Sequence, residues 1–142
     1  MNNFDKCAEW ILNWEQWHSY DKWGGRTLWG VAEKWHKDFV AQYWDIDPQQ
    51  SRELAKAIYR SEYWDKIGGD NLPDKIDAIA FDSAVNAGVA WTMENIITCN
   101  TPLAAMMLRL ERYTDIVNND SGKMVNFRGW VIRLITLWRA LL

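Results

Sequence analysis

The stretch "PDKIDAIAFDSAVNAG", Pro73–Gly88, places apolar side chains on almost every side of a helix. A helix that is apolar all round is buried, so this segment predicts a central helix around which other helices pack. Asp82 and Asn86 lie four residues apart, on one face of this helix. They are candidates for bracing the fold or for holding the loop after Glu15, where they would belong to the substrate-binding set. Bracing is favoured, because buried polar groups are nearly always satisfied internally.

Helix signals recur along the rest of the chain. Asp47–Pro48 and Thr101–Pro102 each place a capping residue before a proline at the first helical position. No segment alternates apolar and polar residues for long enough to indicate a strand. We therefore expect a mainly α-helical fold with a loop from His18 to Arg26. The expected helices cover residues 3–17, 28–39, 48–66, 73–88, 91–99, 102–117 and a C-terminal segment with Phe127, Val131, Leu134, Trp138 and Leu141 on one stripe.

Composition narrows the class of protein. A chain of 142 residues with 25% charged residues suits one compact domain, residues 1–142, and we expect a monomer. The net charge of −3 argues against nucleic-acid binding, which normally needs a basic surface. Cys7 and Cys99 show no disulfide or metal pattern, and we expect both to be reduced. The chain shows no signal peptide and no membrane span, which predicts synthesis in the cytoplasm without stable membrane insertion.

A second stretch, "ILNWEQWHSYDKWGGRTLWG", Ile11–Gly30, sets Glu15 among tryptophans. On a helical wheel Glu15 falls about 20° from Phe4, on the apolar side and at the C-terminal end of the expected helix. Apolar surroundings and the negative end of a helix both disfavour an ionised carboxylate. Glu15 is therefore a candidate general acid that carries a proton near neutral pH. The alternative is a buried glutamate paired with an arginine, such as Arg26 or one from the C-terminal helices.

The residues after Glu15 fit the chemistry of glycoside hydrolysis, which needs a sheltered acid with a second carboxylate or a group that holds water. Asp21 is the candidate second carboxylate, and Thr27 offers a hydroxyl. The glycine pair Gly24–Gly25 allows the backbone to turn tightly beside a ligand. Aromatic residues of this segment are candidates for stacking on sugar rings: Trp17, Tyr20, Trp23 and Trp29. Neither histidine lies at metal-ligand spacing, so no metal is expected.

Several segments resemble the glycoside hydrolase family 108 muramidases, which are lysozyme-like enzymes of phages and bacterial secretion loci. The similar segments are "ILNWE…D…GGRTLWGV", "AIYRSEYWDKIGGDNLP" and "AFDSAVNAG". The terminal "RYTDIV…NFRGWVIRL" resembles the peptidoglycan-binding segment that follows in those proteins. The resemblance implies a lysozyme-like catalytic part, residues 1–97, and C-terminal helices, residues 98–142. Glu15 matches the family's catalytic glutamate, and Gly24, Gly25 and Thr27 match its turn.

The resemblance implies an N-acetylmuramidase without a cofactor, which cleaves the β-1,4 bond between N-acetylmuramic acid and N-acetylglucosamine in peptidoglycan glycan strands. The expected role is either phage lysis or cell-wall remodelling during secretion. The enzyme would act at the cell wall or in the periplasm, reached through a holin or an export system. Glu15 is followed by Gln16, Trp17 and His18 instead of the family's usual glycines. This difference supports the alternative of an inactive peptidoglycan-binding or secretion-accessory protein.

Overall fold

The computed structural model describes residues 3–141 and, for Leu141, the backbone only. Within these residues the chain forms seven α-helices and one three-stranded antiparallel sheet, so the prediction of a mainly α-helical fold is confirmed. The chain divides into two compact units, Met1–Glu62 and Tyr63–Leu142. The expected single domain, with parts that meet between residues 97 and 98, stays a prediction. No helix between residues 3 and 141 is long and apolar enough to cross a membrane.

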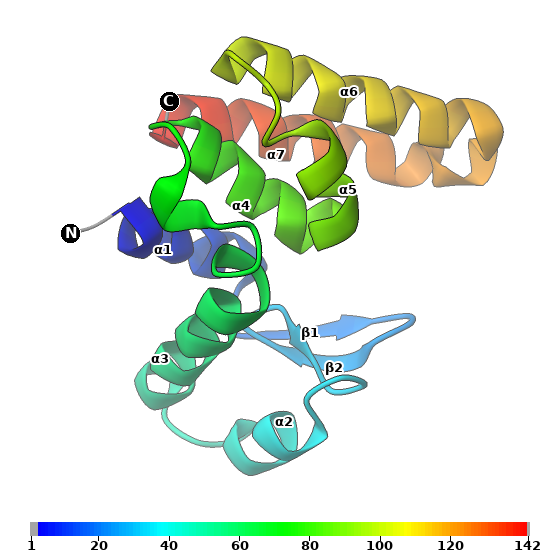
Figure 1. Ribbon diagram of the computed structural model, residues 1–142. Coiled ribbons are helices and arrows are strands. Elements are labelled where there is room, and N and C mark those ends of the chain that lie inside the picture. The colour runs from blue at the N-terminus through cyan, green and yellow to red at the C-terminus, as the bar shows by residue number, and fades with distance from the viewer. Residues whose placement is uncertain (1–2, 142) are drawn as a thin grey trace. The chain divides into compact units, whose positions relative to one another are not determined.

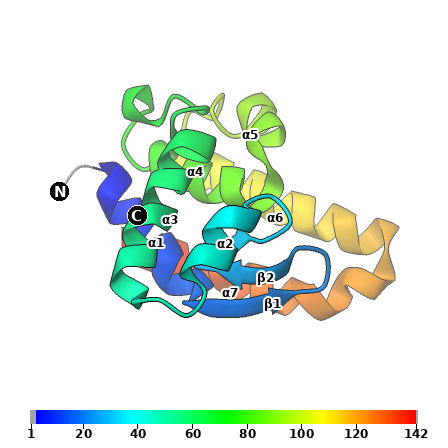
Figure 2. The same ribbon diagram turned by 90° about the horizontal axis from the view of Figure 1, so that it is seen from below.

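In the first unit, α1 (Asn3–Glu15) packs against α3 (Pro48–Tyr59), as Figures 1 and 2 show. An ion pair joins their polar sides, because Lys56 Nζ lies 2.8 Å from the Asp5 carboxylate. The hydrogen bond with Asp5 raises the pKa of Lys56. The packed stripe of α1 consists of apolar side chains that are all buried: Phe4, Cys7, Ala8, Ile11 and Leu12.

A small sheet follows α1. β1 (His18–Asp21) pairs antiparallel with β2 (Gly25–Leu28), and β2 pairs with β3 (Val31–Ala32). The short helix α2 (Lys37–Tyr43) lies against β2 and β3 (Figure 2). Every residue of β1 is exposed, so this strand needs no apolar face and leaves no alternating pattern in the sequence.

The sheet corrects two expectations. The expected loop from His18 to Arg26 belongs to a β-hairpin, and the expected helix from Leu28 to Phe39 is helical only from Lys37 on, where α2 begins. Trp29 and Gly30 have positive φ angles of 54° and 79°. A right-handed helix requires negative φ, so these two residues turn the chain from β2 into β3 instead.

The second unit is built on α4 (Ile76–Ala87), which confirms the prediction of a buried central helix. Every residue from Ile76 to Ala84 is buried. The ring of Trp64 packs edge-on against Phe81 with centroids 5.3 Å apart. A hydrogen bond of 2.9 Å from the Thr92 hydroxyl to Ser83 ties α5 to α4. The apolar interior of this unit therefore centres on one helix.

The remaining helices of the second unit are α5 (Val89–Asn95), α6 (Pro102–Asn119) and α7 (Met124–Leu141). Figure 1 shows α6 and α7 side by side, as their contacts require. The expected helix over residues 48–66 is shorter, because α3 ends at Tyr59 and a π-helical turn, Arg60–Trp64, follows.

Both proline-based helix starts are confirmed. The Asp47 side chain accepts a hydrogen bond from the Gln49 backbone N–H at 2.8 Å, and Thr101 accepts one from Ala104 at 3.2 Å. The start at Pro73 is wrong by three residues, because α4 begins only at Ile76. A capping residue followed by proline is a local signal, which explains its success at these two helices.

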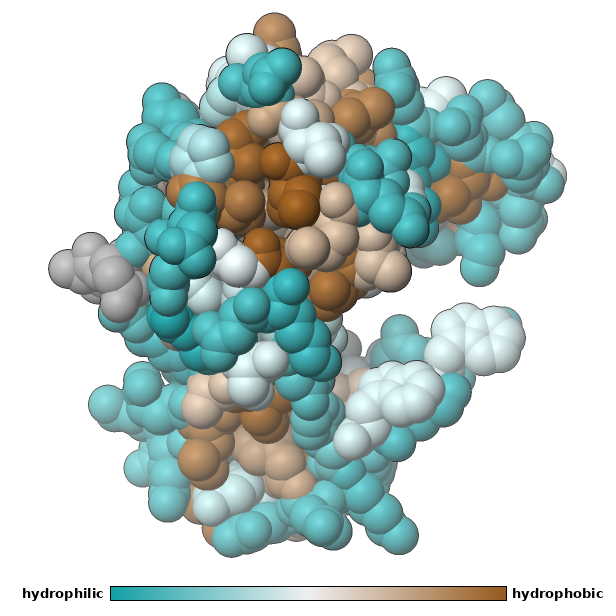
Figure 3. All heavy atoms as spheres, in the orientation of Figure 1, coloured by the Kyte–Doolittle hydropathy of each residue, from teal (hydrophilic) through white to brown (hydrophobic). Residues whose placement is uncertain are grey.

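The expected apolar stripes of α6 and α7 are only partly buried. Met106 and Leu134 are buried, whereas Met107 and Trp138 are exposed. The stripes line an apolar groove of about 470 Å³ between the two helices. The side chain of Leu141, which the expected stripe included, lies outside the described residues. Figure 3 shows further hydrophobic side chains gathered over α4 and α5.

Candidate functional site

Glu15 is the last residue of α1 and stands at the entrance to the sheet. Gln16 takes a left-handed φ of 64°, and its N–H donates to the Leu12 carbonyl at 3.1 Å, so the chain leaves the helix abruptly. The Glu15 side chain is half-buried. Gly30 lies against it, because a Cβ at Gly30 would be 2.7 Å from Cγ of Glu15. The turn after β2 thus lies so close to Glu15 that only glycine fits at position 30.

The register of the sheet gathers four side chains on one face. Ser19 pairs with Thr27, and Thr27 pairs with Ala32. Asp21 shares their face because side chains two residues apart point the same way. All four line a cleft of about 320 Å³, a volume at the lower end for small-ligand sites. The complete lining is Glu15, Ser19, Tyr20, Asp21, Trp23, Gly24, Thr27, Gly30, Ala32, Lys34 and Trp35.

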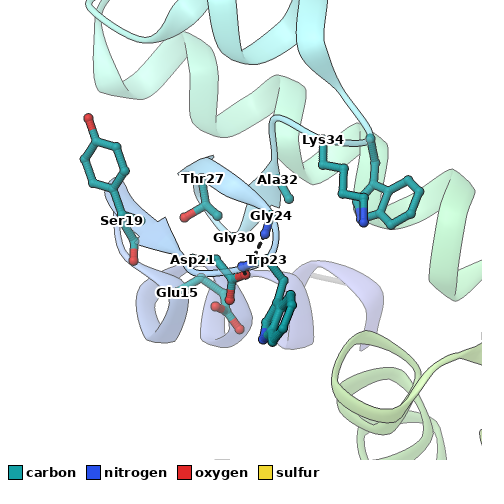
Figure 4. A pocket seen from close by; sticks show the side chains of 11 residues that line it. Glu15, Ser19, Asp21, Trp23, Gly24, Thr27, Gly30, Ala32 and Lys34 are labelled. Carbon is teal, nitrogen blue, oxygen red and sulfur yellow. Dashed lines mark hydrogen bonds between the residues drawn. The ribbon is translucent and has the colours of Figure 1, made fainter.

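The candidate acid and the candidate second carboxylate share this cleft. Figure 4 shows the carboxyl groups of Glu15 and Asp21 in its middle, and Thr27 also lines it. Thr27 is 8% exposed, so its hydroxyl belongs to the cleft wall rather than to the open surface. The three residues expected to be catalytic therefore lie in one small space.

Asp21 also shapes the turn of the hairpin. Its Oδ1 accepts hydrogen bonds from the backbone N–H groups of Trp23 at 2.6 Å and Gly24 at 2.7 Å. This Asx turn fixes the carboxylate. Gly25 then takes a φ of 77° and closes the loop as a left-handed residue. A Cβ at Gly24 would lie 3.0 Å from the Ala32 Cβ, so Gly24 lets two walls of the cleft approach closely.

Tyr20 and Trp23 are the two aromatic residues that the expected set shares with the cleft lining. They are 75% and 74% exposed, and such amphipathic rings can lie against a sugar while their polar edges stay wet. Sequence reasoning missed Gly30, Lys34 and Trp35, and likewise Ser19 and Ala32. The strand register places Ser19 and Ala32, and the sequence alone did not reveal it. Nothing in the sequence distinguishes Trp35 from a tryptophan of the buried core.

Trp17 and Trp29 have other partners, and neither is among the described residues that line the cleft. The Trp17 ring stacks on His18 with centroids 4.0 Å apart, and Trp29 Nε1 donates to the Ser51 hydroxyl at 3.0 Å. The structure thus places these two rings outside the cleft lining, and their stacking on substrate stays a prediction. Gly25 likewise shapes the loop without lining the cleft.

Arg26, the alternative partner expected for Glu15, pairs with Glu33. Its Nε and Nη2 atoms donate to the Glu33 carboxylate at 3.1 Å and 2.7 Å. These hydrogen bonds lower the pKa of Glu33 and raise the pKa of Arg26. The guanidinium group also lies 5.0 Å from the Trp44 ring centroid. Arg26 is therefore engaged with Glu33 and Trp44.

Asp82 and Asn86 are not among the described residues of the cleft, and they join α4 to α6 and α7 instead. Asp82 accepts hydrogen bonds from Arg109 at 2.6 Å and from Arg133 at 2.9 Å. Arg109 also donates to the Tyr113 hydroxyl, which donates to Asn86 at 3.0 Å. Burial opposes ionisation, but both guanidinium groups outweigh it and lower the pKa of Asp82. This geometry agrees with the favoured interpretation, in which Asp82 and Asn86 brace the fold, and their role in substrate binding stays a prediction.

Both histidines lie in polar contacts. His18 Nε2 donates to the Trp44 carbonyl at 2.6 Å, and His36 lies 3.1 Å from the Glu62 carboxylate. Between residues 3 and 141, no three His, Cys, Asp or Glu side chains gather into a group that could hold a metal ion. The chemistry that the cleft itself offers is that of carboxyl, hydroxyl and ammonium groups.

Comparisons with known proteins identify a family and a similar fold. The family model described as glycosyl hydrolase 108 matches residues 8–88, which are more than half of the chain and include the whole cleft. The solved structure of Brucella abortus SagA is similar, with a TM-score of 0.67 and 22% sequence identity. The match covers 97% of this chain and 93% of that chain, and it concerns the fold alone. Among curated proteins, none matches.

Proposed function

The chain belongs to the glycosyl hydrolase 108 family and is thus a glycoside hydrolase, and from this premise we propose that it is an N-acetylmuramidase. Its substrate would be peptidoglycan, and it would hydrolyse the β-1,4 bond between N-acetylmuramic acid and N-acetylglucosamine. One observation carries the proposal: Glu15, at the end of a helix, shares a small cleft with Asp21 and Thr27.

In the proposed reaction, the protonated Glu15 carboxyl group donates its proton to the glycosidic oxygen as the bond from that oxygen to C1 breaks. Positive charge then develops on the sugar, and the Asp21 carboxylate stabilises it or orients the attacking water. The Thr27 hydroxyl helps to place this water, which adds its oxygen to C1. The proton that the water releases goes to Asp21 where Asp21 orients the water, and to the deprotonated Glu15 where Asp21 stabilises the sugar. Tyr20 and Trp23 supply aromatic surface for the neighbouring sugar rings.

The position of Asp21 supports its assigned role. Two backbone N–H groups hold its Oδ1 at 2.6 Å and 2.7 Å, so the carboxylate needs no reorganisation when charge develops beside it. Gly30 plays the corresponding part for Glu15, since its missing side chain leaves the space that the Glu15 methylene groups occupy. Backbone N–H groups thus hold the Asp21 carboxylate, and the backbone at Gly30 leaves room for the Glu15 side chain.

The test is the clearing of a peptidoglycan suspension by the wild type and by Glu15→Gln, which keeps the shape of the side chain and cannot donate a carboxyl proton. General acid catalysis contributes about 10²–10⁴-fold, so we expect a loss in that range. Glu53→Gln, an exposed position on α3, is the matched control and should clear at the wild-type rate. Equal clearing by Glu15→Gln and wild type would remove Glu15 from the mechanism.

Mass spectrometry of the digest then identifies the bond. New reducing ends on N-acetylmuramic acid support the muramidase proposal, and reducing ends on N-acetylglucosamine contradict it. If the chain sediments with insoluble peptidoglycan and releases no reducing ends, the result supports the alternative of a peptidoglycan-binding or secretion-accessory protein. A role of α6 and α7 in wall binding, and access to the wall through a holin or an export system, stay proposals.

A further inference from the structure

The cleft has one cation among its described lining residues, and an exposed aromatic ring accompanies it. Lys34 Nζ lies 4.6 Å from the centroid of the Trp35 ring, within the range of a cation–π interaction. Trp35 is 73% exposed. The proposed reaction assigns neither residue a role, because a cation would oppose the positive charge that develops on the sugar. The role of the Lys34–Trp35 pair therefore lies outside the proton-transfer steps.

Backbone hydrogen bonds hold the pair beside the cleft. The Lys34 N–H donates to the Gly24 carbonyl at 3.2 Å, and the Trp35 N–H donates to the Ala32 carbonyl at 3.1 Å. The turn after β3 is therefore tied to the hairpin loop and forms a second wall of the cleft. The backbone of Lys34 is thus fixed beside the cleft, and its exposed side chain lies over the Trp35 ring.

The charges are separated within the cleft. Figure 4 shows Lys34 toward one end, with Glu15 and Asp21 nearer the middle. A cation in the same cleft as the reacting carboxyl groups, but apart from them, suits a substrate that carries a negative charge on a sugar of the bond that breaks. In a peptidoglycan strand every muramic acid carries a lactyl ether. That ether ends in a carboxylate in peptide-free strands, and in intact peptidoglycan it continues into a stem peptide with carboxylates of its own.

We propose that Lys34 and Trp35 form a subsite for the muramoyl sugar, with a carboxylate of its lactyl side on the ammonium group and the sugar ring against the indole. The inference rests on the proposed function and deepens it. This subsite makes the cleft selective for charged peptidoglycan strands over uncharged polymers of N-acetylglucosamine. Trp23 and Tyr20 then serve sugars on the hairpin side of the same cleft.

The test compares full-length variants on matched glycan strands. The probe is a set of peptide-free strands, used either with free lactyl carboxylates or after conversion of those carboxylates to methylamides. Lys34→Met keeps the length of the side chain and removes the charge. Lys22→Met is the matched control, because Lys22 lies 5.4 Å from the Trp23 ring centroid in a similar pair but is not among the described residues of the cleft.

We expect wild type and Lys22→Met to prefer the charged strands by about tenfold in kcat/KM, the size of one charge-assisted hydrogen bond. In Lys34→Met this preference should fall to about one. A Lys34→Met variant that keeps the tenfold preference overturns the proposal, and so does a wild type without any preference. Thermal unfolding at the wild-type temperature shows that the variant is folded.

Two further measurements distinguish lactyl from stem-peptide carboxylates, and distinguish failure of the subsite from failure of the proposed function. Intact disaccharide-peptide strands test whether Lys34 also binds carboxylates of the stem peptide. If it does, Lys34→Met loses activity on the intact strands as well as on the peptide-free strands. If wild type cleaves none of these strands, the proposed function fails, and tryptophan fluorescence then measures binding of charged and methylamide strands. Binding that depends on both Lys34 and the carboxylate supports the subsite, and binding that ignores either one refutes it.

Discussion

Replacement of Asp82 by asparagine tests how much the second unit depends on its buried charges. Asp82 is fully buried and accepts hydrogen bonds from Arg109 and Arg133. Asparagine keeps the shape but offers one acceptor oxygen and turns an amide N–H₂ group toward the other arginine. The buried guanidinium groups of Arg109 and Arg133 then lose the negative charge that Asp82 supplies to both of them. Breaking a buried ion pair in this way costs about 3–5 kcal/mol.

The expected change in melting temperature follows from the size of the unfolding unit. Residues 63–142 number 142 − 62 = 80, and a domain of that size loses about 4–8 °C per kcal/mol. Asp82→Asn should therefore lower the Tm by at least about 12 °C if this unit unfolds alone. If all 142 residues unfold together, the loss is about 2–4 °C per kcal/mol and the decrease at least about 6 °C.

Thermal unfolding at pH 7, followed by circular dichroism in the far ultraviolet, measures this change. Asp115→Asn removes a carboxylate from an exposed position on α6 and is the matched control, with an expected effect within about 0.5 kcal/mol. Changing Asp82 to leucine together with Arg109→Met and Arg133→Met should restore most of the stability, because apolar replacements leave no unpaired charge. A decrease no larger than that of Asp115→Asn would refute the reasoning.

Three further predictions concern single features. Gly30→Ala should destabilise the fold by about 1–2 kcal/mol, because alanine at position 30 would have to adopt a positive φ. The added Cβ should also displace Glu15 and lower the activity, so an unchanged rate of peptidoglycan clearing would contradict the prediction. Thr101→Ala should cost about 1 kcal/mol in urea unfolding, whereas Thr101→Ser should keep the cap. The pKa of Asp82 is lower in the folded than in the unfolded chain, so its contribution to stability is complete above the unfolded pKa and is lost as the pH falls through the folded pKa. In Asp82→Asn the free energy of unfolding should therefore depend less on pH in the acidic range, as urea unfolding at a series of pH values would measure.

Local signals predicted much of the helical fold. Asp47 and Thr101 mark helix starts through contacts that span only two or three residues, and α4 is recognisable because a helix apolar all round must be buried. The hairpin was not predictable in the same way. Its first strand is exposed on both faces, and its turn into β3 depends on the positive φ of Trp29 as well as Gly30. Tryptophan carries no preference for such a turn.

The residues of the cleft likewise differ in how far the sequence predicts their positions. A helical wheel indicated the position of Glu15, because α1 is regular up to that residue. Asp21 and Thr27 were candidates from their residue types, and they line the cleft together with Glu15. Lys34 was missed because it reaches the cleft only through the bond of its backbone to Gly24, a pairing that follows from the sheet. Long-range pairings of this kind depend on register, which residue types do not fix.

The lining of the cleft has a consequence for how this site can change during evolution. All its residues fall between Glu15 and Trp35, a span of 35 − 14 = 21 consecutive residues. A single short exchange of coding sequence can therefore transfer or redesign the entire site. Insertions into the hairpin loop between β1 and β2 would widen or narrow the cleft while the apolar interior around α4 keeps its own sequence. Such an exchange would have to keep the contacts that join this span to Trp44 and Ser51.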